Sequence, residues 1–247
     1  MNVLAVAGIS KSFGGVEAVA GVSFGVAAGE MLALIGPNGA GKSTCFNMLN
    51  GQLRPDAGEI RLDGRSLAGL APRDIWRLGV GRTFQIAATF ASMSVCENVQ
   101  MALLSHASGL LDFWRPATRL HRAQALALLA RVGIADQADR ACGVLAYGDL
   151  KRVELAVALA NKPRLLLMDE PTAGMAPGER QALMALAAGL AHDDKIAVLF
   201  TEHDMDAVFQ HADRILVLDR GRLIADGTPE QVRADAHVRR IYLGSTA

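Results

Sequence analysis

Residues 36–43 read GPNGAGKS and directly follow the apolar run MLALI at residues 31–35. The stretch matches the pattern GxxxxGK[ST] in full. An apolar helical pattern continues over residues 45–49 and is closed by Gly51, which is typical of a helix C-terminus. The order strand, glycine-rich loop, helix is the context that this pattern requires, so the stretch predicts a phosphate-binding loop inside an α/β fold.

A loop of this kind holds phosphate mainly with its backbone. Successive N–H groups point inward, the following helix adds partial positive charge, and the glycines allow close approach. We expect Lys42 to reach the β- and γ-phosphates of a nucleotide and the Ser43 hydroxyl to bind Mg²⁺. A glycine-rich turn that matches by chance is the alternative, and the flanking strand and helix disfavour it. The residues expected to bind nucleotide in this phosphate loop are Gly36, Pro37, Asn38, Gly39, Ala40, Gly41, Lys42, Ser43 and Thr44.

A second apolar run ends in two acids at residues 165–170, LLLMDE. Asp169 falls at the carboxyl end of the predicted strand, where α/β folds bind ligands, so it can hold Mg²⁺ through water. Glu170 is then placed to orient and deprotonate an attacking water. An ordinary strand end followed by a polar loop is the alternative, and the pairing with Lys42 favours the catalytic interpretation. A GTPase is disfavoured because the nearest match to its NKxD motif, residues 161–164, has Arg where Asp is needed.

The composition sets broad limits on function. The chain has 247 residues with 25 basic and 25 acidic side chains, so it lacks a general electrostatic attraction for nucleic acid. Every long apolar stretch is interrupted before it reaches membrane-spanning length, and the start lacks the basic region of a secretion signal. Cys45, Cys96 and Cys142 are widely spaced, which excludes a CxxC motif and predicts buried thiols in a reducing cytosol.

The distribution of apolar patterns predicts one α/β domain over residues 1–247. Short β-prone segments near the N-terminus suggest antiparallel hairpins, and the apolar strands that alternate with helices later on indicate a parallel sheet covered on both faces. The middle is helical and rich in Ala and Leu. We therefore predict a core formed by about residues 1–90 and 160–247, interrupted by a helical subdomain at about residues 91–159.

Residues 145–156, LAYGDLKRVELA, form a tight loop that leads into a helix. One interpretation is an ordinary helix start in which Asp149 suits the helix dipole, worth about 0.3–1 kcal/mol. The other interpretation is that this helix end faces a ligand.

Together these motifs resemble a family. GPNGAGKST, Gln85, LAYGDLKR, LLLMDEPT and His203 occur in the order and spacing of ATP-binding-cassette nucleotide-binding subunits, over essentially the whole chain. The stretches SKSFGGVEAV, GRTFQ, YGDLKRVELAVALA and the closing IYLG are similar to the ATP-binding subunits of branched-chain amino acid importers. Closely similar subunits serve amide, urea, aromatic acid or lipopolysaccharide transporters, so the cargo stays open.

The resemblance implies roles for three further residues. Phe13 matches the aromatic residue that stacks on adenine, although a core phenylalanine is the alternative. Gln85 matches the glutamine that touches Mg²⁺ and the attacking water. His203 matches the histidine that hydrogen-bonds the γ-phosphate, and a polar loop residue is its alternative. With Glu170, Gln85 and His203 would form the catalytic group, and Ser43, Gln85 and Asp169 would hold the metal.

The resemblance also implies an assembly. It implies ATP and Mg²⁺ as cofactors and two cassettes arranged head to tail, each ATP lying between the phosphate loop of one chain and the signature loop of the other. The signature loop here comprises Leu145, Ala146, Tyr147, Gly148 and Asp149. The implied partners are a second ABC ATPase subunit, identical or different, two membrane-spanning permease subunits and, through the complex, a solute-binding protein. The chain would then be peripheral, on the cytoplasmic face of the inner membrane.

Two departures from the family pattern keep other functions open. Many members have LSGGQ in the signature loop, whereas Ala146 here replaces Ser and Asp149 replaces Gln. A nucleotide-binding scaffold with little hydrolysis is therefore an alternative. A non-transport cassette ATPase that acts on DNA or ribosomes is disfavoured, because the chain has one cassette, no sustained heptads and no basic stripe.

Overall fold

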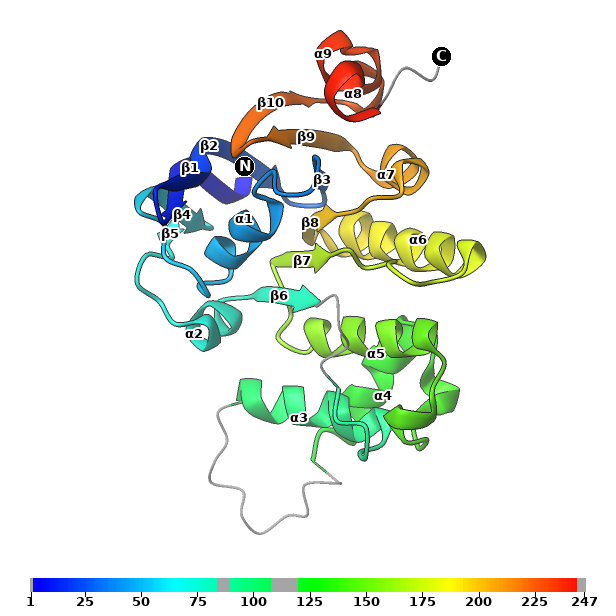
Figure 1. The fold of residues 1–247 in the computed structure, drawn as a ribbon. Helices are drawn as coiled ribbons and strands as arrows, with labels where there is room; N and C mark the ends of the chain where they lie inside the picture. The colour runs from blue at the N-terminus through cyan, green and yellow to red at the C-terminus, as the bar shows by residue number, and fades with distance from the viewer. Residues whose placement is uncertain (1, 84–88, 108–119, 244–247) are drawn as a thin grey trace.

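The computed structural model describes residues 2–83, 89–107 and 120–243, which form two sheets and a surrounding set of helices (Figure 1). The strands are β1 (Asn2–Phe13), β2 (Val16–Ala27), β3 (Met31–Ile35), β4 (Ala57–Leu62), β5 (Arg65–Ser66), β6 (Val80–Thr83), β7 (Leu165–Asp169), β8 (Ala197–Thr201), β9 (Arg214–Asp219) and β10 (Arg222–Gly227). The helices are α1 (Lys42–Leu49), α2 (Pro72–Arg77), α3 (Val95–Ala107), α4 (Arg122–Arg131), α5 (Tyr147–Leu159), α6 (Pro177–Asp194), α7 (Met205–His211), α8 (Pro229–Ala234) and α9 (Ala236–Val238). A π-helical turn at Arg239–Leu243 follows them.

The larger sheet has six strands in the order β10-β9-β3-β8-β7-β6. The pairs β3–β8, β3–β9, β7–β8 and β6–β7 are parallel, as the apolar runs predict. The β10 strand departs from this expectation, because it pairs with β9 in the antiparallel sense. Arg220 and Gly221 both have positive φ, which allows the tight turn that reverses the chain there.

Apolar side chains alternate between the two faces of this sheet. On β3, Met31, Ala33 and Ile35 belong to one buried cluster, and Leu32 and Leu34 belong to the other. The strands β7 and β8 divide in the same way. Because both faces are covered, these strands read as continuous apolar runs and not as alternating ones.

The smaller sheet is antiparallel, in the order β2-β1-β4-β5. Its first hairpin joins β1 to β2 through Gly14 and Gly15, both at positive φ. The helix α1 lies between the two sheets (Figure 1), and Cys45 and Phe46 on it are fully buried. The structure thus confirms the N-terminal antiparallel part of the fold.

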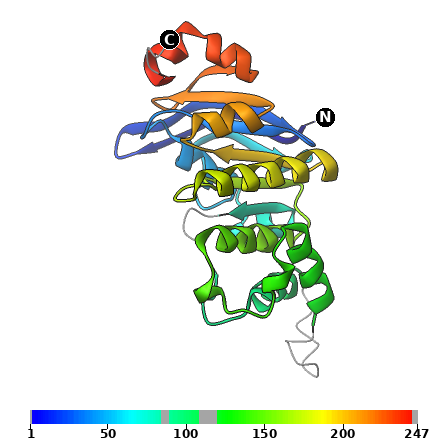
Figure 2. The same ribbon diagram turned by 90° about the vertical axis from the view of Figure 1, so that its right-hand side faces the viewer.

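The helices α3, α4 and α5 pack on one another beyond the β6 edge of the larger sheet (Figures 1 and 2). Their contact surfaces include Val99, Leu129 and Val153, all fully buried. Lys151 and Glu154 form an ion pair of 2.9 Å inside α5, with both side chains buried. The three cysteines are free and buried, as expected. Within residues 2–83, 89–107 and 120–243, no helix is both long and apolar enough to span a bilayer.

The strand order places four carboxyl ends side by side. Since β3, β8, β7 and β6 are adjacent and parallel, their carboxyl ends all lie at the same edge of the sheet. This edge carries the phosphate loop after β3, residues 169–170 at the end of β7 and residues 201–203 at the end of β8. Segments far apart in the chain therefore meet there, as is usual for ligand sites of open α/β sheets.

Candidate functional site: a nucleotide site at the sheet edge

The phosphate loop is packed too tightly for larger residues. Gly36 has φ 150°, and a Cβ atom there would lie 2.1 Å from the Leu218 carbonyl oxygen. Gly41 has φ 105°, and a Cβ atom there would lie 2.4 Å from the Ala18 carbonyl oxygen. Both positions require glycine, because an L-residue would combine backbone strain with a clash. The loop is therefore fixed against β9 on one side and β2 on the other.

Lys42, the first residue of α1, is buried and bonded to its own loop. Its Nζ donates to the carbonyl oxygens of Gly36 at 2.6 Å and Pro37 at 3.1 Å. Burial lowers the pKa of Lys42, while the negative charges of Glu170 and Asp169 raise it. The two acids therefore lie near enough to act on the ammonium group, and the lysine holds the loop in a curved conformation.

Asp169 is held by two donors from other elements. The Thr201 hydroxyl donates to its Oδ1 at 2.8 Å, and Arg82 Nη2 donates to its Oδ2 at 3.3 Å. Arg82 also donates to Asn47 Oδ1 on α1 at 2.9 Å. The guanidinium thus connects the acid at the end of β7 with the helix that follows the phosphate loop.

Glu170 and His203 contact each other directly. His203 Nε2 lies 2.9 Å from Glu170 Oε1, and because an ionised carboxylate only accepts, Nε2 carries the proton in that state. Glu170 has a left-handed φ of 48°. For a residue with a side chain this conformation costs a free energy of about 1–3 kcal/mol. Its N–H donates to both the carbonyl and the hydroxyl oxygen of Thr201, at 3.1 and 3.0 Å. Thr201 therefore holds both acids in place.

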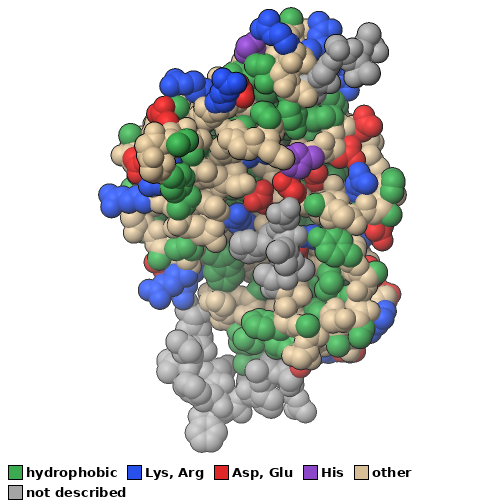
Figure 3. All heavy atoms as spheres, in the orientation of Figure 1, with side chains coloured by type: hydrophobic (Ala, Val, Ile, Leu, Met, Phe, Trp, Pro, Cys, Tyr) green, Lys and Arg blue, Asp and Glu red, His purple; other side chains and the backbone are tan. Residues whose placement is uncertain are grey.

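A histidine and several acidic side chains gather near the middle of the face shown in Figure 3, between the α/β part above and the helical part below.

Phe13 ends β1 and is 47% exposed, which excludes the alternative of a core phenylalanine. Lys11 Nζ lies 5.7 Å from the centre of its ring. Gln85 lies outside the described residues.

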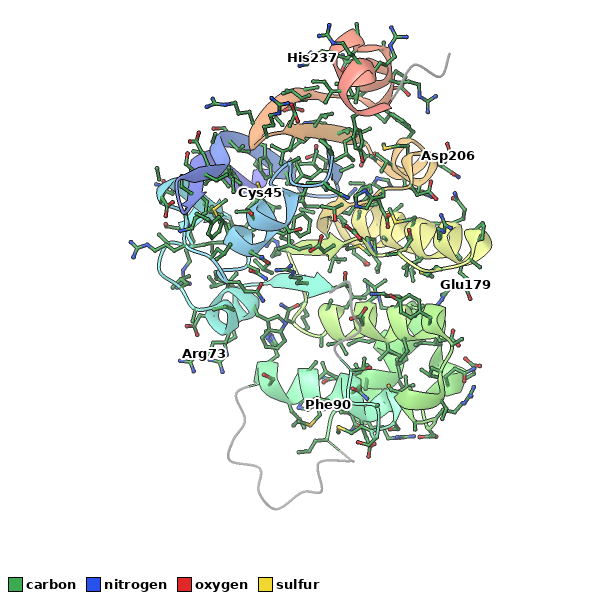
Figure 4. All side chains as sticks on the ribbon, in the orientation of Figure 1. Cys45, Arg73, Phe90, Glu179, Asp206 and His237 are labelled. Carbon is green, nitrogen blue, oxygen red and sulfur yellow. The ribbon has the colours of Figure 1, made fainter. Side chains whose placement is uncertain are left out.

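The signature loop differs from the phosphate loop in its contacts. Ala146 is the N-cap of α5, with extended backbone angles, and Asp149 falls in the first helical turn, as predicted. Tyr147 is 40% exposed. A Cβ atom on Gly148 would lie 3.0 Å from the carboxyl group of Glu179, which stands at the start of α6 (Figure 4). Two acids, Asp149 and Glu179, therefore lie at this helix end.

The donor set at the sheet edge suits Mg²⁺. The Ser43 side chain is exposed and Asp169 offers carboxylate oxygens, the ligand type that Mg²⁺ prefers. One Asp169 oxygen accepts a hydrogen bond from Thr201 and the other from Arg82, and each keeps a further lone pair. Among the residues that the structure describes, no group of three or more His, Cys, Asp or Glu could hold a metal alone. The residues fit an ion that takes its other ligands from phosphate and water.

Comparison with protein families identifies this arrangement. Residues 19–173 match the model of the ABC transporter family, and this range covers the phosphate loop, the signature loop and the two acids at the end of β7. The chain belongs to the ABC transporter family. It is an ATP-binding cassette, and the cassettes of this family are ATPases. Residues 222–247 match a second model, described as "Branched-chain amino acid ATP-binding cassette transporter".

Several curated ABC transporter proteins are similar to the chain over almost its full length. The high-affinity branched-chain amino acid transport ATP-binding protein BraF of Pseudomonas aeruginosa is 41% identical over 251 residues, which cover 98% of each chain. The corresponding protein LivG of Salmonella typhimurium is 42% identical over 248 residues, which cover 98% of this chain and 97% of that one.

Solved structures of ABC cassettes have the same fold. A nucleotide-free ATP-binding cassette from an ABC transporter superposes with a TM-score of 0.88 at 31% identity, covering 99% of this chain and 100% of that chain. The cassette cbiO1 from Clostridium perfringens, part of the transporter complex cbiONQ, gives 0.82 at 29% identity, with coverage of 97% and 93%.

Sequence reasoning missed three residues of this ABC cassette site. Arg82 donates to Asp169, Thr201 bonds to both acids at the end of β7, and the Tyr242 hydroxyl from the C-terminal turn lies beside the Gly36 backbone. Burial raises the pKa of Tyr242, so its hydroxyl stays protonated beside the phosphate loop. Arg82 lies in the GRTFQ stretch and Tyr242 in the IYLG stretch. The resemblance of these two stretches to importer subunits was the only sequence signal for the two residues.

Proposed function

We propose that this cassette hydrolyses ATP to power a membrane importer of branched-chain amino acids or a related small polar solute. The observation that carries the proposal is the meeting of the phosphate loop, Asp169 and the Glu170–His203 pair at one sheet edge. The names of the relatives that match 98% of the chain support the choice of cargo.

The phosphate loop would bind the β- and γ-phosphates. Its N–H groups and the start of α1 supply positive potential, so the loop favours an anion without further cations. Lys42 would exchange its bonds to the Gly36 and Pro37 carbonyls for phosphate oxygens. Since those bonds lie within the loop, the exchange needs only rotation of one side chain. Phe13, exposed at the end of β1, would stack on the adenine ring.

Ser43 and Asp169 would hold Mg²⁺, with Gln85 as a further ligand. The bound ion would neutralise charge that develops on the phosphate oxygens. Arg82 and Thr201 would keep Asp169 pointing toward the nucleotide, because each fixes one carboxylate oxygen.

Glu170 would take a proton from the attacking water as its oxygen forms a bond to the γ-phosphorus. The bond from that phosphorus to the bridging oxygen breaks, leaving ADP and phosphate. His203 would orient Glu170 through the 2.9 Å contact and donate to the γ-phosphate when the nucleotide is bound. Gln85 would help to place the water.

The signature loop would complete the site of a second cassette, identical or different. Leu145, Ala146, Tyr147, Gly148 and Asp149 would face its γ-phosphate, and α5 would point its N-terminus at that anion. Closure of the pair on ATP and reopening after hydrolysis would move two membrane-spanning permease subunits. A solute-binding protein would deliver the cargo, and the cassette would stay peripheral on the cytoplasmic face of the inner membrane.

Transport by the purified complex tests this function. The complex would be isolated from membranes through a tag on this chain, reconstituted with its solute-binding protein and supplied with ATP on the cassette side. We expect ATP-dependent uptake of labelled leucine, isoleucine or valine, and no uptake by the matched Glu170→Gln complex. Uptake of urea or an amide in place of these amino acids would contradict the cargo, and ATP hydrolysis without uptake of any solute would contradict the importer.

A further inference from the structure

Glu202, at the end of β8, is a buried acid that joins two loops of the site. Its side chain is almost inaccessible, and the residue is 3% exposed. Its Oε1 accepts from the Thr172 backbone N–H at 2.8 Å and from the Thr172 hydroxyl at 2.7 Å. Its Oε2 accepts from the His203 N–H at 3.2 Å. One carboxylate therefore binds the loop after β7 to the residue that contacts Glu170.

A second connection runs parallel to the first. Arg180 on α6 donates through Nε to the Met175 carbonyl at 2.9 Å and through Nη1 to Asp204 Oδ2 at 2.7 Å. Asp204 also caps α7 by accepting from two backbone N–H groups. The loop of residues 170–176 is thus tied at both ends to residues 202–204.

The other side of the 170–176 loop lies against the signature loop. Gly174 has φ 79°, and a Cβ atom there would lie 3.6 Å from a ring carbon of Tyr147. Glu179, just after this loop, borders Gly148. The loop therefore stands between the Glu170–His203 pair and the signature loop of the same chain.

We propose that Glu202 is a positioning residue that couples this chain's nucleotide site to its own signature loop. A change at His203 on nucleotide binding moves the Oε2 side of the carboxylate, and the Oε1 side carries that movement to Thr172. The loop then shifts against Tyr147. The coupling rests on the proposed function, because it gives the γ-phosphate of one site an effect on the loop that completes the other.

The chemistry of the carboxylate makes this link specific. Three donors converge on two acceptor oxygens, and bonds to an ionised acceptor are about twice as strong as neutral ones. A glutamine has the same shape but only one acceptor atom in its amide. In Glu202→Gln at least one of the three donors therefore faces an NH₂ group, and the link opens without loss of volume.

Hydrogen–deuterium exchange on the full-length chain tests the coupling. The protein is kept at a concentration where sedimentation shows a monomer, and exchange of the peptide over residues 144–155 is followed with and without Mg-ATP in the Glu170→Gln background. We expect ATP to change exchange of this peptide, and Glu202→Gln to reduce that change by about 2- to 30-fold. ATP affinity should stay within about twofold, because the Glu202 carboxylate bonds to Thr172 and His203 and not to the phosphate loop.

A double-mutant cycle separates coupling from simple structural damage. Thr172→Val keeps the side-chain volume and removes the hydroxyl donor. Since Glu202 and Thr172 belong to one link, the double variant should lose no more of the response than either single variant. Asp206→Asn is the matched control, because Asp206 is exposed on α7 close by (Figure 4) and only its backbone joins the network. It should leave the response unchanged.

Two results would overturn the inference. The first is an ATP-dependent change in exchange that is as large in Glu202→Gln as in the protein without this substitution. The second is a reduced change that parallels the loss of thermal stability in each variant, with the two single-variant reductions adding up in the double variant. Hydrolysis by the protein without the Glu170 change is measured separately. If that protein binds ATP but does not hydrolyse it, the proposed function fails, while the exchange response still decides the coupling.

Discussion

In the proposed dimer the phosphate loop and the signature loop of one cassette would serve two different nucleotides, and the two loops are built in opposite ways. In the phosphate loop, Gly36 and Gly41 lie close to backbone oxygens of Leu218 and Ala18, and the Lys42 ammonium group adds positive charge. In the signature loop, Gly148 borders the flexible carboxylate of Glu179, Tyr147 is exposed and Asp149 adds negative charge. On the proposed function, the phosphate loop would be preformed for an anion, whereas the signature loop would depend on backbone groups that compete with nearby acids.

Removal of the proposed base should have the largest effect, and the effect should be confined to the site that holds the phosphate loop. Glu170→Gln should lower kcat by roughly 10²–10⁴-fold, since general base catalysis typically contributes that much. ATP binding should persist, because the phosphate loop is intact. Single-turnover hydrolysis and equilibrium binding of a fluorescent ATP analogue measure the two effects. Turnover near that of the unchanged protein would remove Glu170 from this role.

Substitution of one glycine by alanine in each loop should affect stability very differently. Gly41→Ala places a Cβ atom 2.4 Å from a backbone oxygen at φ 105° and should cost at least about 1–3 kcal/mol, with loss of ATP binding. Gly148→Ala meets only the end of a movable side chain and lies in a helix, where Ala is favoured over Gly by about 0.5–1 kcal/mol. Urea unfolding of both variants measures the difference. An equal decrease in the free energy of unfolding in both variants would show that the two loops are equally rigid.

Restoring a hydroxyl in the signature loop should have the smallest effect. Ala146 is the N-cap of α5, so Ala146→Ser should stabilise the chain by about 0.5–2 kcal/mol. It should also raise ATP affinity at the partner's site by about threefold or more, because a hydroxyl donor joins the γ-phosphate contacts. Val144→Ser, an exposed change in the same segment, is the control. Unchanged affinity at both sites would contradict the assignment of this loop to the partner's nucleotide.

The sequence predicted the parts of the site that are local in the chain. GPNGAGKS after an apolar strand and LLLMDE at the end of another are contiguous patterns, so their elements and the α/β fold followed from periodicity and glycine placement. The antiparallel β10 was not anticipated, although the two-residue connection at Arg220 and Gly221 is too short for the crossover that a parallel strand needs.

The contacts that hold the acids could not be predicted in the same way. Arg82 and Asp169 are separated by 87 positions, and Thr201 and Asp169 by 32. These pairs meet because β7 lies between β6, which carries Arg82, and β8, which carries Thr201, and strand order is not encoded by any local pattern. The pairing of Glu170 with His203 has the same origin, since the resemblance gave each a role but not their contact.

The position of β3 in the sheet also has a consequence for biosynthesis. Its neighbours are β8 and β9, and Met31 pairs with Val198 while Leu32 pairs with Arg214. A ribosome must therefore release most of the chain before this strand finds either neighbour, and Gly36 cannot settle against the Leu218 carbonyl any earlier. A truncated polypeptide would carry the whole GPNGAGKS motif and still lack an ordered nucleotide site. ATP binding would then mark a chain that has been synthesised nearly to its end.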